Sequence, residues 1–136
     1  MITKNEIIPS LLKIFPNIQK DWEEYQTDWN NESPGDYTEI SVFARRVITD
    51  YKLSNTEYFY KLFEYVEKIF NEGDEDARNL IGIGLLEDIQ TLGSHEEFGY
   101  KVFEKWLREL SLRAWYQIEK MWEGKSSLMD VIRSGN

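Results

Sequence analysis

Apolar side chains recur at helical spacing along most of the chain, so the sequence predicts an all-α protein. The clearest case is the segment after Ser54, where apolar residues fall on one helix face and Lys and Glu occupy the opposite face. No segment alternates apolar and polar residues between hairpin turns, so we expect no β-sheet. The apolar residues of this stripe are Phe59, Leu62, Phe63, Val66, Ile69 and Phe70.

The pattern and its turn signals predict a single-domain bundle of six to seven helices over residues 1–136. The first three helices are expected at about 5–15, 17–28 and 37–52, because Pro16 ends the first and a segment rich in turn formers precedes the third. Two Ser-x-x-Glu capping boxes, at 54–57 and 94–97, predict helix starts near residues 55 and 95. The second start begins a long helix near 95–123 that ends at Gly124, with a short seventh helix as an option over 127–132.

The segment near 75–92 is apolar on nearly every side, which is typical of a helix at the centre of a domain. Gly73 is expected to end the preceding helix in a left-handed conformation, and Asp74 to cap the central one. Gly82 and Gly84 would each cost about 1 kcal/mol relative to Ala inside a helix. We therefore expect a neighbouring helix to approach closely at these glycines.

Glu87 falls inside the apolar ring of this central helix. A carboxylate there is either partnered in the core, with Arg45 or Arg46 as candidate partners, or part of a functional patch. The sequence leaves both interpretations open.

Residue types exclude most kinds of catalytic chemistry. The chain has no Cys, which rules out disulfides, thiolate zinc sites and cysteine nucleophiles. Its only His, His95, is expected in the first turn of a helix, where a cation is unfavourable, so we do not expect it to act as a base. Gly82 and Gly84 lie inside a helix and lack the third glycine of a phosphate loop. We expect no enzyme, no metal and no cofactor; an enzyme built on carboxylates alone, or a small-ligand binder, stays a minor alternative.

Charge points to the class of partner. The formal net charge is −9, and residues 71–98 hold eight acids against one base, Arg78. Such a chain is repelled by nucleic acid and by anionic membranes and suits a basic protein partner. Solubility and helix dipoles are the alternative explanation for individual acids.

With no secretory signal and no long apolar run, we expect a cytoplasmic protein.

Aromatic residues among acids are typical of protein-binding surfaces. Trp22 is more simply explained as core, whereas Trp29 at the loop edge is not. Trp115 and Tyr116 are either a partner surface or covered by the C-terminal segment. The predicted partner-binding residues are Asp28, Trp29, Glu32, Asp36, Glu72, Asp74, Glu75, Asp76, Glu87 and Asp88.

Two segments carry a resemblance to a family. Residues 63–89, with a helix, a Gly-Asp-Glu turn and a helix closing in Leu-Glu-Asp-Ile, and residues 9–16, Pro-Ser-Leu-Leu-Lys-Ile-Phe-Pro, resemble an uncharacterised family of small helical bacterial proteins. Such proteins are similar to immunity proteins of polymorphic or contact-dependent toxin systems. The resemblance implies a protein that binds a cognate toxin domain, here expected to be basic, and occludes its active site. The alternative is a helical adaptor or regulatory domain; the oligomeric state is open.

Overall fold

A computed structural model describes the backbone of residues 1–134 and the side chains of residues 1–123. Within this part the chain is helical and has no β-strand, which confirms the predicted all-α fold. Besides its α-helices, this part of the chain has three short segments: two 3-10 turns, η1 (Lys4–Glu6) and η3 (Lys101–Trp106), and a π-helical stretch, η2 (Leu80–Leu86). The α-helices are α1 (Ile7–Ile14), α2 (Gln19–Asp28), α3 (Asp36–Lys52), α4 (Phe59–Glu72), α5 (Glu75–Asn79), α6 (Glu87–Ser94) and α7 (Glu109–Ser134).

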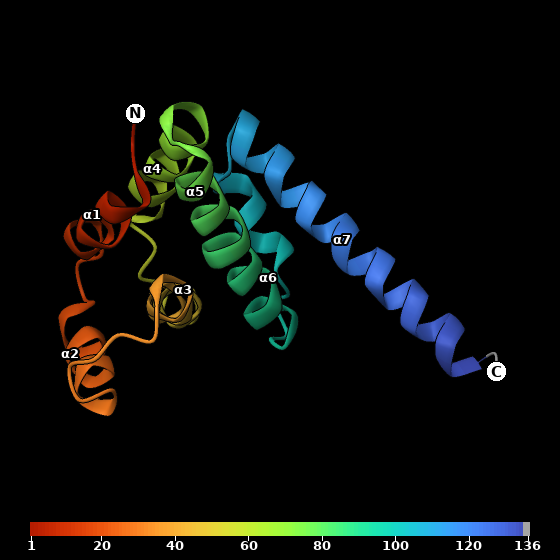
Figure 1. Cartoon of the computed structure of the whole chain (residues 1–136), viewed down its shortest axis with the longest axis horizontal. Coiled ribbons are helices and arrows are strands. Elements are labelled where there is room, and N and C mark those ends of the chain that lie inside the picture. The colour runs from red at the N-terminus through yellow and green to blue at the C-terminus, as the bar shows by residue number, and fades with distance from the viewer. Residues whose placement is uncertain (135–136) are drawn as a thin grey trace.

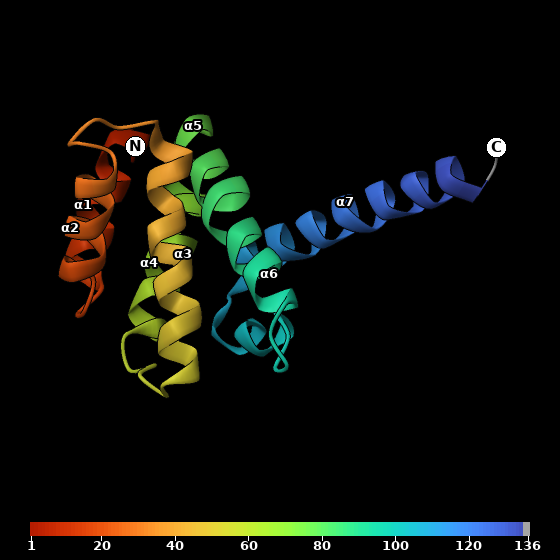
Figure 2. The ribbon, with the colours of Figure 1, turned by 90° about the horizontal axis from the view of Figure 1, so that it is seen from below.

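The helices form layers on either side of α3 and α4, which run antiparallel (Figures 1 and 2). Helices α1 and α2 lie on one side of this pair, and the run α5–η2–α6 lies on the other, with α7 beyond it. One continuous core joins all of them and includes five aromatic side chains with essentially no exposed surface. These side chains are Phe43, Phe59, Phe63, Phe103 and Trp115.

The predicted central helix near 75–92 is the continuous run α5–η2–α6, from Glu75 to Ser94. Its middle is buried almost all round. A Cβ added to Gly84 would lie 2.9 Å from the Cγ2 atom of Ile40 in α3, so Gly84 permits the predicted close approach. A Cβ on Gly82 would meet only the ring of Phe70 at 3.7 Å, an ordinary contact, so that explanation does not hold for Gly82. The π-helical geometry has no signal in the sequence that we identified.

Both predicted capping boxes are wrong. Ser54 has a φ of +61° and belongs to the turn that ends α3, while α4 begins only at Phe59. Ser94 is the last residue of α6, and its hydroxyl donates to the carbonyl of Thr91. The expected start near residue 95 is therefore a loop, and His95 follows the end of α6 instead of opening a helix.

The long last helix starts later and ends later than the predicted 95–123. The extended backbone of Leu107 separates η3 from α7, which runs through Gly124 to Ser134. The start of α7 is fixed by Glu67 of α4, whose carboxylate accepts hydrogen bonds from the amides of Leu110 at 2.9 Å and Ser111 at 2.8 Å. Burial alone would raise the pKa of Glu67, but these hydrogen bonds hold it below its ordinary value. Side chains of the optional seventh helix, 127–132, lie outside the described residues.

The N-terminus is tied to the turn between α4 and α5. The Ile2 amide donates to the Glu72 carbonyl at 3.0 Å, and the Asp74 amide donates to the Ile2 carbonyl at 2.9 Å. Gly73 between them is extended (φ −83°, ψ 155°), so the predicted left-handed end is wrong. The predicted cap at Asp74 is confirmed, because its Oδ1 accepts from the Ala77 amide at 2.8 Å.

Candidate functional site

A groove of about 390 Å³ runs between α2 and α3. Its α2 side carries three carboxylates, Asp21, Glu24 and Asp28, which share a helix face because they are spaced i, i+3 and i+7. The α3 side is lined mainly by small and uncharged side chains, with Arg45 as the cation among the described lining residues. The groove therefore has one strongly acidic wall.

Most of this negative charge is open to a partner. Asp21 pairs with Arg46 across 3.5 Å. Glu24 and Asp28 are exposed and have no Lys or Arg within salt-bridge distance among the described residues. Two uncompensated carboxylates on one face suit a partner's Lys or Arg.

An aromatic residue stands at the rim of the groove. Trp29 follows the last residue of α2 and is 45% exposed. The turn after it is built from Asn30 and Asn31, both in the left-handed region, and Gly35 at a φ of +125°. These residues let the chain reverse into α3 while Trp29 stays at the surface, where it can act as an anchor for a bound protein.

The floor of the groove belongs to the core. Tyr25 is buried and stacks on Trp22, with ring centroids 5.3 Å apart, and Trp22 contacts Phe43 at 5.7 Å. The expectation that Trp22 is a core residue is thus confirmed. This packing holds the acidic face of α2 in a fixed position against α3.

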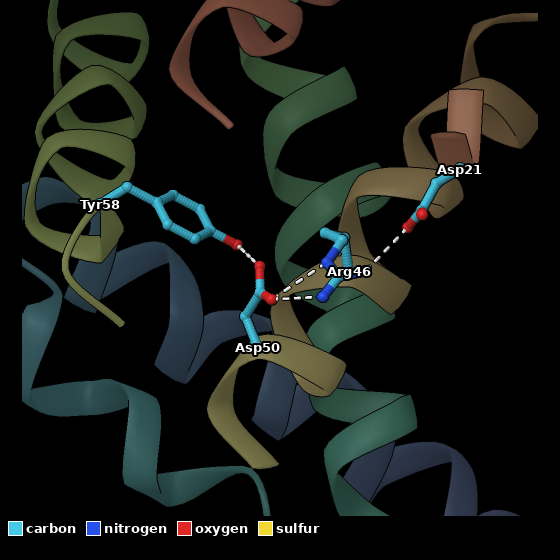
Figure 3. Close-up of polar contacts among 4 residues, drawn as sticks. All are labelled: Asp21, Arg46, Asp50 and Tyr58. Atoms are coloured by element: carbon cyan, nitrogen blue, oxygen red, sulfur yellow. Dashed lines mark hydrogen bonds and ion pairs between the residues drawn. The ribbon is translucent and has the colours of Figure 1, made fainter. Parts of the chain in front are cut away.

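A buried polar network lies behind the groove (Figure 3). Asp50 has no exposed surface and accepts hydrogen bonds from Arg46 Nε at 3.0 Å and from the Tyr58 hydroxyl at 2.5 Å. Arg46 also reaches Asp21 at the groove, so one guanidinium links the groove to the core. Burial and the hydrogen bond to Asp50 raise the pKa of Tyr58 far above its ordinary value, so Tyr58 stays a neutral donor.

The structure places the predicted loop acids at one end of the bundle. Glu32 lies in the α2–α3 loop, and Asp36 opens α3 and pairs with Lys4 of η1 at 3.5 Å. Because η1 also packs on α5, the turn between α4 and α5 lies at the same end (Figure 2). That turn carries the predicted residues Glu72, Asp74, Glu75 and Asp76.

Glu87 and Asp88 are not brought to that end. They start α6, about 16–18 Å further along the helical run than Asp76 by helical rise. Glu87 is half-buried beside α7 residues that include Ile118 and Met121. Neither candidate partner pairs with Glu87: Arg46 binds Asp50 and Asp21, and Arg45 acts on Asp88.

Asp88 should make stability depend on pH. Burial and the neighbouring Glu87 raise the pKa of Asp88 to about 6, against a partial opposing effect of Arg45. Protonated Asp88 therefore contributes stability that is fully present below about pH 4 and is lost as pH rises through about 6. We expect Asp88→Asn to raise the free energy of unfolding by roughly 1–2 kcal/mol at neutral pH, with little change near pH 4.

Urea unfolding of Asp88→Asn and the unsubstituted chain at both pH values measures this difference. Glu97→Gln, an exposed acid on the loop after α6, is the control and should show no such pH dependence. An Asp88→Asn effect of equal size at both pH values would contradict the shifted pKa.

Sequence reasoning left Asp21, Glu24 and Arg45 out of the predicted site. The spacing of Asp21, Glu24 and Asp28 was available as a signal, because three acids on one helix face predict an acidic stripe. Arg45 comes from a different helix and had no such signal. Conversely, Trp115 has no exposed surface, so its interpretation as a partner surface is wrong, whereas Tyr116 is 42% exposed.

Among residues 1–123, no three His, Cys, Asp or Glu side chains are grouped so that they could hold a metal ion. None of the helices in the described part of the chain is both long and apolar enough to pass through a lipid bilayer.

Comparison with known families decides the chain's classification. Residues 8–123 match the family described as Domain of unknown function (DUF7674). The chain belongs to this family. No curated protein and no solved structure was found to match the chain. The DUF7674 match runs from α1 into α7 and includes every residue that lines the groove, but its description assigns no activity.

Proposed function

We propose that this DUF7674 protein is an immunity-like protein that binds a basic toxin domain and occludes its active site through the groove between α2 and α3. The observation that carries the proposal is the acidic wall of this groove, in which Glu24 and Asp28 have no cationic partner among the described residues. Arg or Lys side chains of a toxin would pair with these carboxylates through charge-assisted hydrogen bonds. Trp29 supplies the aromatic anchor at the rim.

A nuclease-type toxin fits this surface best. Enzymes that act on nucleic acid gather Lys and Arg around the phosphates of their substrate. A rigid row of carboxylates can take the place of those phosphates, and like-charge repulsion keeps the inhibitor itself away from nucleic acid. Inhibition of this kind needs complementary charge and a fixed backbone and requires no catalysis by the DUF7674 chain.

The alternative is a helical adaptor that uses the same groove to hold a basic segment of another protein. Both functions predict binding, and only the first predicts loss of a partner's enzymatic activity. A bound partner that keeps full activity would favour the adaptor.

The charge of the groove provides the test. We expect the chain to co-purify with the protein encoded by the adjacent open reading frame, with an affinity that falls as salt is raised. Reversing two groove charges in Glu24→Lys/Asp28→Lys should weaken binding by about tenfold per charge, or about 1.4 kcal/mol each. Isothermal titration calorimetry at several salt concentrations measures this loss.

A matched control separates local charge from net charge. Glu57→Lys/Glu97→Lys changes the net charge by the same amount at exposed positions away from the groove. This control should bind nearly as well as the unsubstituted chain. Absence of a complex, an affinity indifferent to salt, or equal losses in both double variants would contradict the proposal.

A further inference from the structure

A second pocket lies between α6 and α7, which run side by side (Figure 1). Its volume is about 420 Å³, within the range of sites for small molecules, about 300–1,000 Å³. Gln90 of α6 and His95 directly after it form one side, and Glu119, Trp122 and Glu123 of α7 form the other. The described lining residues include no Lys or Arg. We call this site the α6–α7 pocket.

Two aromatic side chains give the pocket surfaces that attract cations. Trp122 is 44% exposed, and Tyr100, just before η3, is partly buried. The Tyr100 ring lies 5.9 Å from that of the fully buried Trp115, which holds it in place. The face of an aromatic ring carries negative charge density, and Trp binds organic cations best among the aromatic residues.

Two carboxylates add negative charge that no described cation compensates. Glu119 and Glu123 are one turn apart on α7, and neither has a Lys or Arg within salt-bridge distance among residues 1–123. The Tyr100 hydroxyl donates to Glu119 Oε2 at 2.6 Å. This hydrogen bond, burial and the charge of Glu123 raise the pKa of Tyr100 to about 12, so Tyr100 stays a neutral donor. The second oxygen of Glu119 is left to accept from a ligand.

A buried amide supplies an acceptor from the opposite helix. Gln90 lines the pocket although it is only 4% exposed. Its Nε2 donates to the carbonyl of Trp115 at 3.0 Å. Because a carbonyl can only accept, this bond fixes the orientation of the amide and leaves its oxygen as an acceptor. Buried polar atoms are normally hydrogen-bonded, which favours a ligand with N–H donors over a quaternary ammonium, which has none.

We propose that the α6–α7 pocket binds a small organic molecule that carries a primary ammonium group. The three N–H donors of the ammonium match the oxygens of Glu119, Glu123 and Gln90, and the indole of Trp122 packs on the cation and on the hydrocarbon next to it. The pocket shares no lining residue with the α2–α3 groove. The proposal therefore does not depend on the function proposed above.

Titration of the full chain with hexylamine, followed by nitrogen-15 NMR at pH 7, tests the site. An alkylamine is protonated at this pH. We expect saturable shifts of the Trp122 indole and of the Gln90 side-chain amide. The uncharged analogue 1-hexanol should bind at least about tenfold more weakly, because it makes no charge-assisted hydrogen bond to the carboxylates.

Two substitutions test the two kinds of contact. Glu119→Gln keeps an acceptor for Tyr100 but loses the charge, so it should weaken hexylamine binding by about tenfold. Trp122→Leu should weaken it roughly two- to fivefold. The matched controls are Glu109→Gln, an exposed acid on α7 outside the pocket, and Trp29→Leu, at a tryptophan that is 45% exposed. Both controls should bind like the unsubstituted chain.

Several outcomes would overturn the proposal. These are no saturable binding, equal affinity for hexylamine and 1-hexanol, shifts confined to the Trp29 indole, or binding that neither Glu119→Gln nor Trp122→Leu weakens. Tighter binding of Nα-acetyl-lysine methylamide than of hexylamine would assign the pocket to a lysine of a partner protein instead. Glu24→Lys/Asp28→Lys should leave hexylamine binding at the α6–α7 pocket unchanged, so failure of either proposal is seen separately.

Discussion

Replacing Asp50 with alanine is expected to lower the free energy of unfolding by about 3–5 kcal/mol. Asp50 has no exposed surface and accepts hydrogen bonds from both Arg46 and Tyr58. The substitution leaves the buried Tyr58 hydroxyl without its acceptor and the Arg46 guanidinium with only the longer contact to Asp21. Urea denaturation at neutral pH, followed by circular dichroism, measures the loss.

Two further variants show where this energy comes from. Tyr58→Phe removes only the hydroxyl, and the Asp50 carboxylate keeps its hydrogen bonds from Arg46, so we expect a smaller loss of about 1–2 kcal/mol. Asp28→Ala removes an exposed carboxylate and should change stability by less than about 0.5 kcal/mol. An Asp50→Ala variant as stable as Asp28→Ala would mean that the network does not stabilise the fold.

The same network shows why the site could be predicted only in part. The exposed Trp29 and the acids around it were predicted because aromatic residues among carboxylates form a local pattern. Pairing is not local: Arg45 and Arg46 are neighbours in sequence, yet one acts on Asp88 and the other holds Asp50 and Asp21. These two roles fall on adjacent residues of α3, and the sequence offers no signal that shows which arginine takes which role.

Some helix bounds likewise have causes nearby in the sequence, whereas others depend on residues far away in it. The bounds of α3 and the whole run from Glu75 to Ser94 follow from periodicity and from breakers within a few residues, and both were close to prediction. The start of α7 depends on Glu67, which lies more than forty residues earlier in the chain. A Ser-x-x-Glu motif at 94–97 matched a helix start locally, but the amides that receive a cap are those of Leu110 and Ser111.

The class of the proposed partner and the proposed surface differ in what the sequence could show. Net charge is a property of composition, so the amino-acid sequence is enough to predict a basic partner. The groove has residues of α2 on one side and residues of α3 on the other, and this juxtaposition follows only from the structure.

Replacing Trp115 with alanine is expected to lower the free energy of unfolding by about 3–5 kcal/mol. Trp115 has no exposed surface, and its indole Nε1 donates to Glu104 of η3 at 3.1 Å. Its carbonyl accepts from Gln90 of α6 at 3.0 Å, and its ring lies 5.9 Å from that of Tyr100. The alanine variant leaves a cavity at the point where α7 meets both elements, and urea denaturation measures the cost.

Two further variants show which property of Trp115 stabilises the fold. One tests its hydrogen bond, and the other tests whether loss of an exposed tryptophan has the same effect. Trp115→Phe keeps most of the ring but loses the donor, so the expected loss is about 1–2 kcal/mol. Trp29→Ala removes an exposed indole and should leave stability within about 0.5 kcal/mol while it weakens binding to the proposed basic partner. A Trp115→Ala variant with unchanged stability would contradict the packing of α7 on η3 and α6.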